Sequence, residues 1–124
     1  YATMKSIWDQ AIYTVSKPSE EDDYLYLTET LKQRNLVDID FALTTFNMSS
    51  YTNGKTPGDN SITNVTQPVL SLWGEKDIIV PEYMIDETVN ALENCQKVVL
   101  KNSGHSPLVD CPDLLATYIT NFFV

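Results

Sequence analysis

The sequence predicts an α/β fold in which a helical segment precedes a parallel strand-helix-strand-helix unit. Three observations lead to this class. Apolar residues recur at helical spacing through about the first 48 residues. Two short apolar runs, Pro68–Trp73 and Lys97–Lys101, then read as strands. A helical pattern follows each run, and the pattern between them is long enough for a right-handed crossover between parallel neighbours.

The composition restricts the class of protein. With 124 residues and 43% hydrophobic content, the chain can form one folded domain or part of one. Its 17 acidic and 8 basic residues give a net charge of −9, which repels phosphate backbones, so nucleic acid is not expected as a partner. No apolar run approaches the roughly 20 residues that span a bilayer. The chain begins at Tyr1, which suggests a truncated or processed product.

Residues 1–50 are expected to form a helical segment of three short helices. The first ends near Lys17–Pro18, and its apolar stripe consists of Met4, Ile7, Trp8, Ala11, Ile12 and Val15. The second begins after Ser19, because the acidic residues 20–23 suit a helix N-terminus. The third runs from Asp38 to about Met48.

Residues 51–67 are rich in turn formers without sustained periodicity, which indicates a connecting loop before the unit at residues 68–124. Pro68–Trp73 is typical of a strand buried on both faces. Pro81 suits the start of the next helix, and Pro112 that of the last. Because two parallel strands alone leave both outer edges unpaired, we expect the chain to be the end of a larger sheet.

Two polar residues follow the two predicted strands. Asp77 lies just after the first strand, and His105, the single histidine, lies just after the second. The carboxyl ends of parallel strands meet at one edge of a sheet, so these side chains should be neighbours. A carboxylate bonded to one imidazole nitrogen leaves the other nitrogen able to take a proton from a nucleophile. Either residue alone is more often a turn former or a solvated side chain, but their joint placement favours a catalytic pair.

The stretch Pro68–Pro81, with its Gly-x-x-Asp-x-x-Val-Pro pattern, and the later Gly104–Pro107 resemble the C-terminal part of the α/β-hydrolase superfamily. In that superfamily the last two strands lead to the catalytic acid and the catalytic histidine. The resemblance covers residues 67–124 and implies that Asp77 is the acid and His105 the base. By the same likeness, Tyr1 to about Met48 resembles the helical cap over the active site.

A cap of this kind shapes the access of substrate. Its aromatic and sulfur side chains are candidates for lining an apolar substrate pocket, although helical core is the more frequent role for such a stripe. The candidates carried forward are Trp8, Phe41, Phe46 and Met48.

One part of the superfamily's machinery is missing from the sequence. The nucleophile elbow Gly-x-Ser-x-Gly does not occur; Gly54–Gly58 has the glycine spacing, but its centre is Thr56 and no strand leads into it. The nucleophile is therefore expected on a segment outside this chain, and the isolated chain should have no more than trace esterase activity.

The resemblance implies a parent protein that hydrolyses an ester or a related acyl bond of a small-molecule substrate. Epoxide, haloalkane and peptide-terminal hydrolysis stay open, because the nucleophile and the pocket decide among them. The alternative is a non-catalytic member of the superfamily that binds a small molecule as a receptor. The expected partner is the missing N-terminal core segment or a second copy of the chain. No metal or organic cofactor is expected, since the acidic residues 20–23 lack histidine partners.

Overall fold

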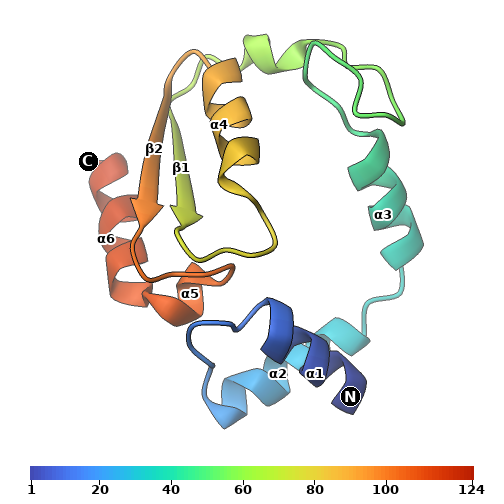
Figure 1. Ribbon diagram of the computed structural model, residues 1–124, viewed down its shortest axis with the longest axis vertical. Coiled ribbons are helices and arrows are strands. Elements are labelled where there is room, and N and C mark those ends of the chain that lie inside the picture. The colour runs from blue at the N-terminus through green and yellow to red at the C-terminus, as the bar shows by residue number, and fades with distance from the viewer.

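The computed structural model describes residues 1–124 as six α-helices, one 3₁₀ helix and two strands (Figure 1). In chain order these are α1 (Ala2–Ala11), α2 (Glu20–Leu31), α3 (Leu36–Thr45), η1 (Ser61–Asn64), β1 (Val69–Gly74), α4 (Glu82–Ala91), β2 (Cys95–Leu100), α5 (Pro107–Asp110) and α6 (Pro112–Phe122).

The two strands form the predicted parallel pair. Val69 lies opposite Cys95 at one end of the ladder, and Gly74 lies opposite Leu100 at the other. Helix α4 makes the crossover and packs on both strands, and Figure 1 shows the strands between α4 and α6. The carboxyl ends of the strands point toward α5 and the α1–α2 pair. The predicted α/β class is therefore confirmed, and the loops that follow the strands share one edge.

The helical segment begins largely as expected. At α2, the Oγ of Ser19 accepts a hydrogen bond from the N–H of Asp22 at 3.1 Å, as the predicted helix start requires. Helix α1, however, ends at Ala11 rather than near Lys17. The chain turns there because the N–H of Tyr13 reaches the Trp8 carbonyl at 2.9 Å and the buried Tyr13 ring packs edge-on against Trp8.

Helix α3 also differs from the prediction, since it starts at Leu36 and ends at Thr45, three residues before Met48. The side chain of Asn47 explains the early end. Its amide nitrogen donates to the carbonyls of Tyr51 and Thr56 at 2.8 and 3.0 Å, which stabilises a polar loop in place of a further helical turn. In Figure 1, α3 stands apart from the sheet.

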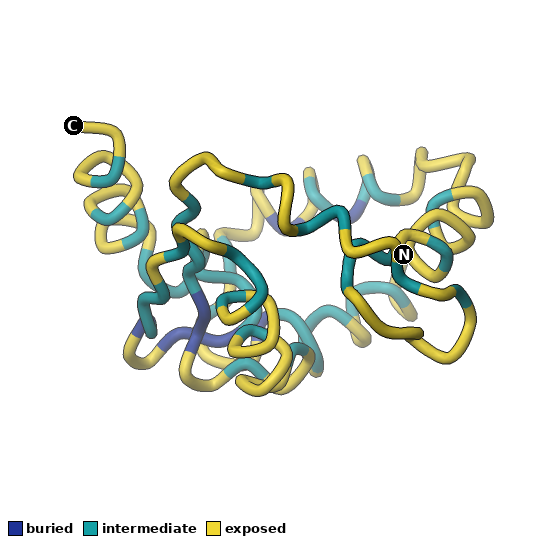
Figure 2. Tube along the Cα trace, turned by 90° about the horizontal axis from the view of Figure 1, so that it is seen from above, coloured by how far each residue is buried: buried dark blue, intermediate teal, exposed yellow.

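The core of the chain is small. Only 8 of the 124 residues are buried, and Figure 2 shows them as short stretches in a largely exposed trace. The accessible surface is 8644 Å² for a mass of 14.0 kDa. A compact monomer of that mass exposes about 6,700 Å². The chain therefore exposes about 1,900 Å² more than its size requires, by the same scaling.

Part of this surplus lies beside β1. The sequence predicts a strand buried on both faces, but within β1 only Trp73 and Gly74 are buried. The sheet has only two strands, so β1 lacks a neighbour at its second edge, and the apolar surface beside it is left open. An apolar groove of about 610 Å³ runs between β1 and α6, lined by Pro68, Val69, Leu70, Leu72, Ile119, Phe122 and Phe123.

Candidate active site

The loop after β1 aims the carboxylate of Asp77. The N–H of Asp77 donates to the carbonyl of Gly74 at 3.0 Å, which closes a tight turn at the strand end. Asp77 Oδ1 in turn accepts hydrogen bonds from the N–H groups of Ile79 and Val80, at 2.8 and 3.0 Å. The indole N–H of Trp73 then donates to the Val80 carbonyl at 2.8 Å. An aspartate that bonds its own downstream main chain is held in one orientation.

The loop after β2 is fastened to the loop after β1. The N–H of Lys76 donates to the Ser103 carbonyl at 2.8 Å, and the N–H of Glu75 donates to the Leu100 carbonyl at 3.1 Å. Asn102 adopts φ of 59°, a left-handed conformation that asparagine tolerates better than most residues. The chain then passes through the buried Ser103 and reaches His105.

Gly74 permits this close approach. A Cβ at position 74 would lie 2.2 Å from the Gly104 carbonyl oxygen and 2.6 Å from that of Ser103. Both obstacles are main-chain atoms, so no side chain could rotate away to make room. Glycine at position 74 is therefore a requirement for bringing the two loops together.

The two loops bring Asp77 and His105 into contact. His105 Nδ1 lies 3.0 Å from Asp77 Oδ2 and 3.2 Å from Oδ1. The Asp77 side chain is 7% exposed, whereas the His105 side chain is 31% exposed. With the proton on Nδ1, the ring donates to the carboxylate and its Nε2 is available as an acceptor. The pair thus combines a shielded acid with an imidazole that a reacting group can reach.

The surroundings of Asp77 favour its ionised form. Burial raises the pKa of this carboxyl, but the hydrogen bonds from the Val80 N–H, the His105 ring and the Ile79 N–H outweigh that effect. The net result is a pKa of Asp77 below the ordinary value of 3.8. The carboxylate is therefore charged at neutral pH and can stabilise an imidazolium beside it.

A hollow of about 200 Å³ adjoins the pair. Apolar side chains shield the carboxylate there, among them Leu72, Val80, Ile85 and Pro107. None of these four was a predicted site residue. Their positions in the sequence could have indicated this role. Val80 and Pro107 flank the loops that carry Asp77 and His105, and Ile85 is on the half-buried side of α4.

The predicted pocket residues lie in different places. Trp8 lines a hollow of about 320 Å³ together with Tyr13 and Tyr26. The same hollow is also lined by residues that follow His105, namely Ser106, Leu108 and Val109. Phe41 and Phe46 are 69% and 70% exposed, on α3 and just after it, and Met48 lies half-buried in the loop that follows. The structure therefore brings Trp8 near the residues after His105 and does not gather the other three around it.

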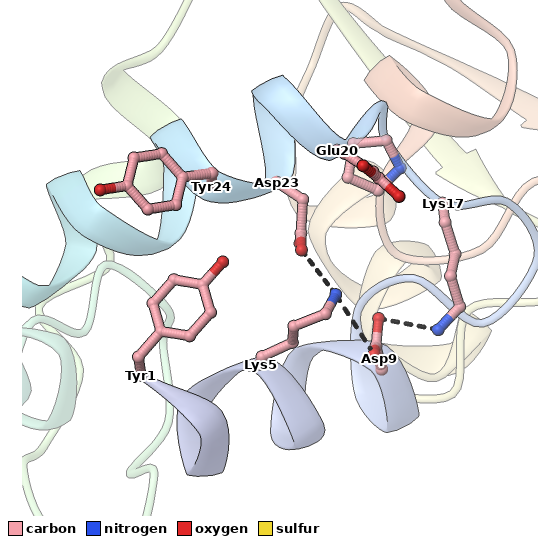
Figure 3. A pocket seen from close by; sticks show the side chains of 8 residues that line it. Tyr1, Lys5, Asp9, Lys17, Glu20, Asp23 and Tyr24 are labelled. Carbon is pink, nitrogen blue, oxygen red and sulfur yellow. Dashed lines mark hydrogen bonds and ion pairs between the residues drawn. The ribbon is translucent and has the colours of Figure 1, made fainter.

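A second hollow, between α1 and α2, is lined mainly by charged groups (Figure 3). Lys5 Nζ lies 2.5 Å from Asp23 Oδ2 and 3.4 Å from Asp9 Oδ2, and Lys17 Nζ lies 2.8 Å from Asp9 Oδ1. The hydrogen bond to Asp23 raises the pKa of Lys5, and that from Lys17 lowers the pKa of Asp9. The Lys5–Asp23 pair joins α1 to α2, and the Lys17–Asp9 pair fastens the segment between the two helices to α1. We assign both pairs a structural role.

Two further features of the chain bear on its chemistry. No group of three or more His, Cys, Asp or Glu side chains is placed to hold a metal ion. None of the helices has both the length and the apolar character that crossing a bilayer requires.

The fold and the paired residues define the class: a piece of a parallel α/β sheet with an acid and a histidine at the carboxyl ends of adjacent strands. No protein-family model matches the sequence, and no curated protein matches it. Among solved structures, the chain is similar to the "putative lipase (lip1)" of Acinetobacter baumannii AYE, with a TM-score of 0.68 and 24% sequence identity. The match covers 95% of this chain and 39% of that chain. The chain thus has the fold of part of that protein.

Proposed function

We propose that Asp77 and His105 are the acid and base of a hydrolytic triad that cleaves an ester or a related acyl bond. The observation that carries this proposal is the 3.0 Å contact between His105 Nδ1 and Asp77 Oδ2 at the carboxyl edge of two parallel strands. The likeness to a protein named as a lipase supports the choice of an acyl bond. The His105 ring hydrogen-bonds no side chain other than Asp77, and the sequence has no Gly-x-Ser-x-Gly elbow, so we place the nucleophile on a segment outside these 124 residues.

The chemistry follows from the two ring nitrogens. His105 Nε2 takes the proton of the nucleophile as that group attacks the acyl carbon, and Asp77 stabilises the imidazolium that results. The imidazolium then gives the proton to the leaving alcohol, which departs and leaves an acyl-enzyme. A water molecule loses its proton to the same nitrogen as it attacks the acyl group, and the nucleophile regains a proton when the acid product is released.

The helical segment at residues 1–50 is proposed as the cap over this site, and residues 68–124 as part of the core. Trp8, with Tyr13 and Tyr26, offers an apolar wall that faces the residues following His105. This hollow suits the apolar portion of an ester substrate. Phe41, Phe46 and Met48 stay predictions as pocket residues.

We also propose that the partner of the chain is the remainder of an α/β-hydrolase core, in the same polypeptide or a separate one. The apolar groove beside β1 and the strand's unpaired edge are the surfaces it would cover. The surplus exposed area, about 1,900 Å², exceeds the roughly 800 Å² per partner of a standard interface and is in the range of permanent ones. Sedimentation velocity tests this partner, because a second copy occupying the groove would appear as a concentration-dependent dimer of the isolated chain.

Hydrolysis of a 4-nitrophenyl acyl ester tests the function. In a protein that joins this chain to the nucleophile segment, we expect His105→Ala and Asp77→Asn to lower kcat by about 10³–10⁴-fold. Asp113→Asn, on exposed α6, is the matched control and should leave kcat unchanged.

Full activity in the His105→Ala variant would overturn the proposal. Turnover by the isolated chain that depends on His105 would show instead that the nucleophile lies within it. Tight binding of a small molecule without turnover would favour the receptor alternative.

A further inference from the structure

Asp110, at the end of α5, bonds two segments that are far apart in the sequence. Its Oδ2 accepts a hydrogen bond from the N–H of Gly104 at 2.7 Å. Its Oδ1 accepts one from the N–H of Ser16 at 2.9 Å, across 94 positions of the chain. The mechanism proposed above does not use this carboxylate, so both of its contacts need another explanation.

The first contact fixes the main chain that carries the catalytic imidazole. Gly104 directly precedes His105, and the bond from its N–H to Asp110 closes a loop around the histidine. The loop is also closed at its base, where the N–H groups of Val109 and Asp110 both donate to the Ser106 carbonyl at 2.9 Å. A hydrogen bond to a charged acceptor is stronger than one between neutral groups, so Asp110 restrains the peptide next to His105.

The second contact seats the helical segment on the same loop. Ser16 follows α1, and its neighbours Thr14 and Val15 lie against Gly104. A Cβ at Gly104 would lie 2.9 Å from Thr14 Oγ1 and 3.4 Å from Val15 Cγ2. The segment after α1 thus lies so close to the residue before His105 that no side chain fits between them, and Asp110 bonds both segments.

We propose that Asp110 is a positioning residue that couples the seating of the helical segment to the alignment of His105. The proposal rests on the proposed function, in which His105 is the general base. A carboxylate that only closed its own turn would need a single acceptor oxygen for Gly104. Asp110 uses its second oxygen for the N–H of Ser16, so a displacement of the helical segment is transmitted to the main chain beside the imidazole.

Substitutions at both ends of the connection test the coupling. Asp110→Asn keeps one acceptor oxygen and turns the other position into a donor, so one of the two N–H groups loses its partner. Asp110→Glu keeps both acceptor oxygens and is the conservative rescue. Ser16→Pro removes the donor N–H without touching Asp110, and Ser16→Ala, which retains that N–H, is its matched control.

Two readouts are needed. In the protein that includes the nucleophile segment, Asp110→Asn should lower kcat for a 4-nitrophenyl ester by about 10- to 100-fold with KM unchanged, because small misplacements of a catalytic group are costly. Ser16→Pro should lower kcat in the same direction by a smaller factor, Asp110→Glu should recover part of the loss, and Ser16→Ala should match the wild type. In the 124-residue chain, the ¹⁵N signals of the single imidazole should shift in Asp110→Asn and Ser16→Pro.

Wild-type kcat and imidazole signals in both Asp110→Asn and Ser16→Pro would overturn the proposal, as would a change in KM alone. Wild-type behaviour of Ser16→Pro beside a defective Asp110→Asn would overturn the coupling and leave Asp110 serving only the histidine loop. If Asp110→Asn does not fold, Ser16→Pro decides. If the proposed hydrolase activity itself is absent, the imidazole signals of the chain still test the connection, so the two failures are distinguishable.

Discussion

The two halves of the chain are held together by different kinds of interaction. In residues 68–124, a parallel ladder and close main-chain contacts between Gly74 and Gly104 fix the loops that carry Asp77 and His105. In residues 1–67, the Lys5–Asp23 ion pair joins α1 to α2, the Lys17–Asp9 pair fastens the segment between them to α1, and α3 exposes nearly all of its residues. The strand unit therefore fixes the geometry of the candidate site through its own main-chain contacts, while charged side chains contribute to holding the helical segment in place.

The two halves therefore differ in what each leaves incomplete: the strand unit lacks a cover for its groove, and the helical segment depends on its attachment to the histidine loop. The strand unit holds the acid–histidine pair with its own hydrogen bonds, yet its apolar groove beside β1 is uncovered. The helical segment contacts the histidine loop through Asp110 and Gly104. We therefore expect substitutions in the strand unit to act on the alignment of the pair, and those in the helical segment to act on its attachment.

The largest effect is expected from Gly74→Ala. Its added Cβ would meet the carbonyl oxygens of Gly104 and Ser103 at 2.2 and 2.6 Å, so the two loops must move apart. We expect a loss of about 1–3 kcal/mol in the free energy of unfolding and a fall of about 10²-fold in kcat. Denaturant titration and ester hydrolysis measure the two effects.

Gly54→Ala is the control for this prediction. Position 54 has open space around it but a φ of 86°, so alanine is strained there without touching the site. Its cost should be about 1 kcal/mol with kcat unchanged. A Gly74→Ala variant no worse than Gly54→Ala would contradict the close packing of the two loops.

The helical segment should respond to Lys5→Met. This change leaves the Asp23 carboxylate, whose side chain is only 10% exposed, without its cationic partner. We expect a lower midpoint of thermal unfolding and weaker attachment of α1 to α2. Lys32→Met is the control, since the pair of Lys32 with Glu29 is exposed and contributes little. Equal midpoints for the two variants would remove the structural role assigned to the charged hollow.

A smaller effect concerns pH. Because the pKa of Asp77 is lower in the folded chain than its ordinary value of 3.8, its ionisation stabilises the folded state fully above that value. The contribution is lost as the pH falls below 3.8 and through the lower folded pKa. The difference in unfolding free energy between the wild type and Asp77→Asn should therefore shrink as the pH falls from 6 toward 3, in denaturant titrations at each pH. A difference that grows on acidification would reverse the assigned sign.

Much of the strand unit could be predicted from the sequence, because local signals specify it. An apolar run bounded by proline and glycine marked β1, the short apolar run Lys97–Lys101 marked β2, and parallel pairing placed Asp77 and His105 at one edge. Other features depend on contacts between distant residues. The early end of α1 requires Tyr13 to pack on Trp8, and the role of Asp110 requires a bond to Ser16 that no local pattern encodes.

Burial was the least predictable property. The apolar run of β1 indicated a strand covered on both faces, yet in this chain most of the strand is only half-buried. Burial depends on what lies beside the strand, and the sequence of one strand does not contain its neighbour. The same reasoning applies to Phe41 and Phe46, the pocket candidates on and just after α3, which are 69% and 70% exposed in this chain.

The tautomer of His105 tests the central claim most directly. The chain has one histidine, so its imidazole ¹⁵N signals need no assignment among several rings. If Asp77 holds the ring as the 3.0 Å contact indicates, the neutral imidazole of the wild type should carry its proton on Nδ1, and Asp77→Asn should shift the population toward the Nε2–H form. The same tautomer ratio in both proteins would contradict the acid–histidine pair and, with it, the proposed triad.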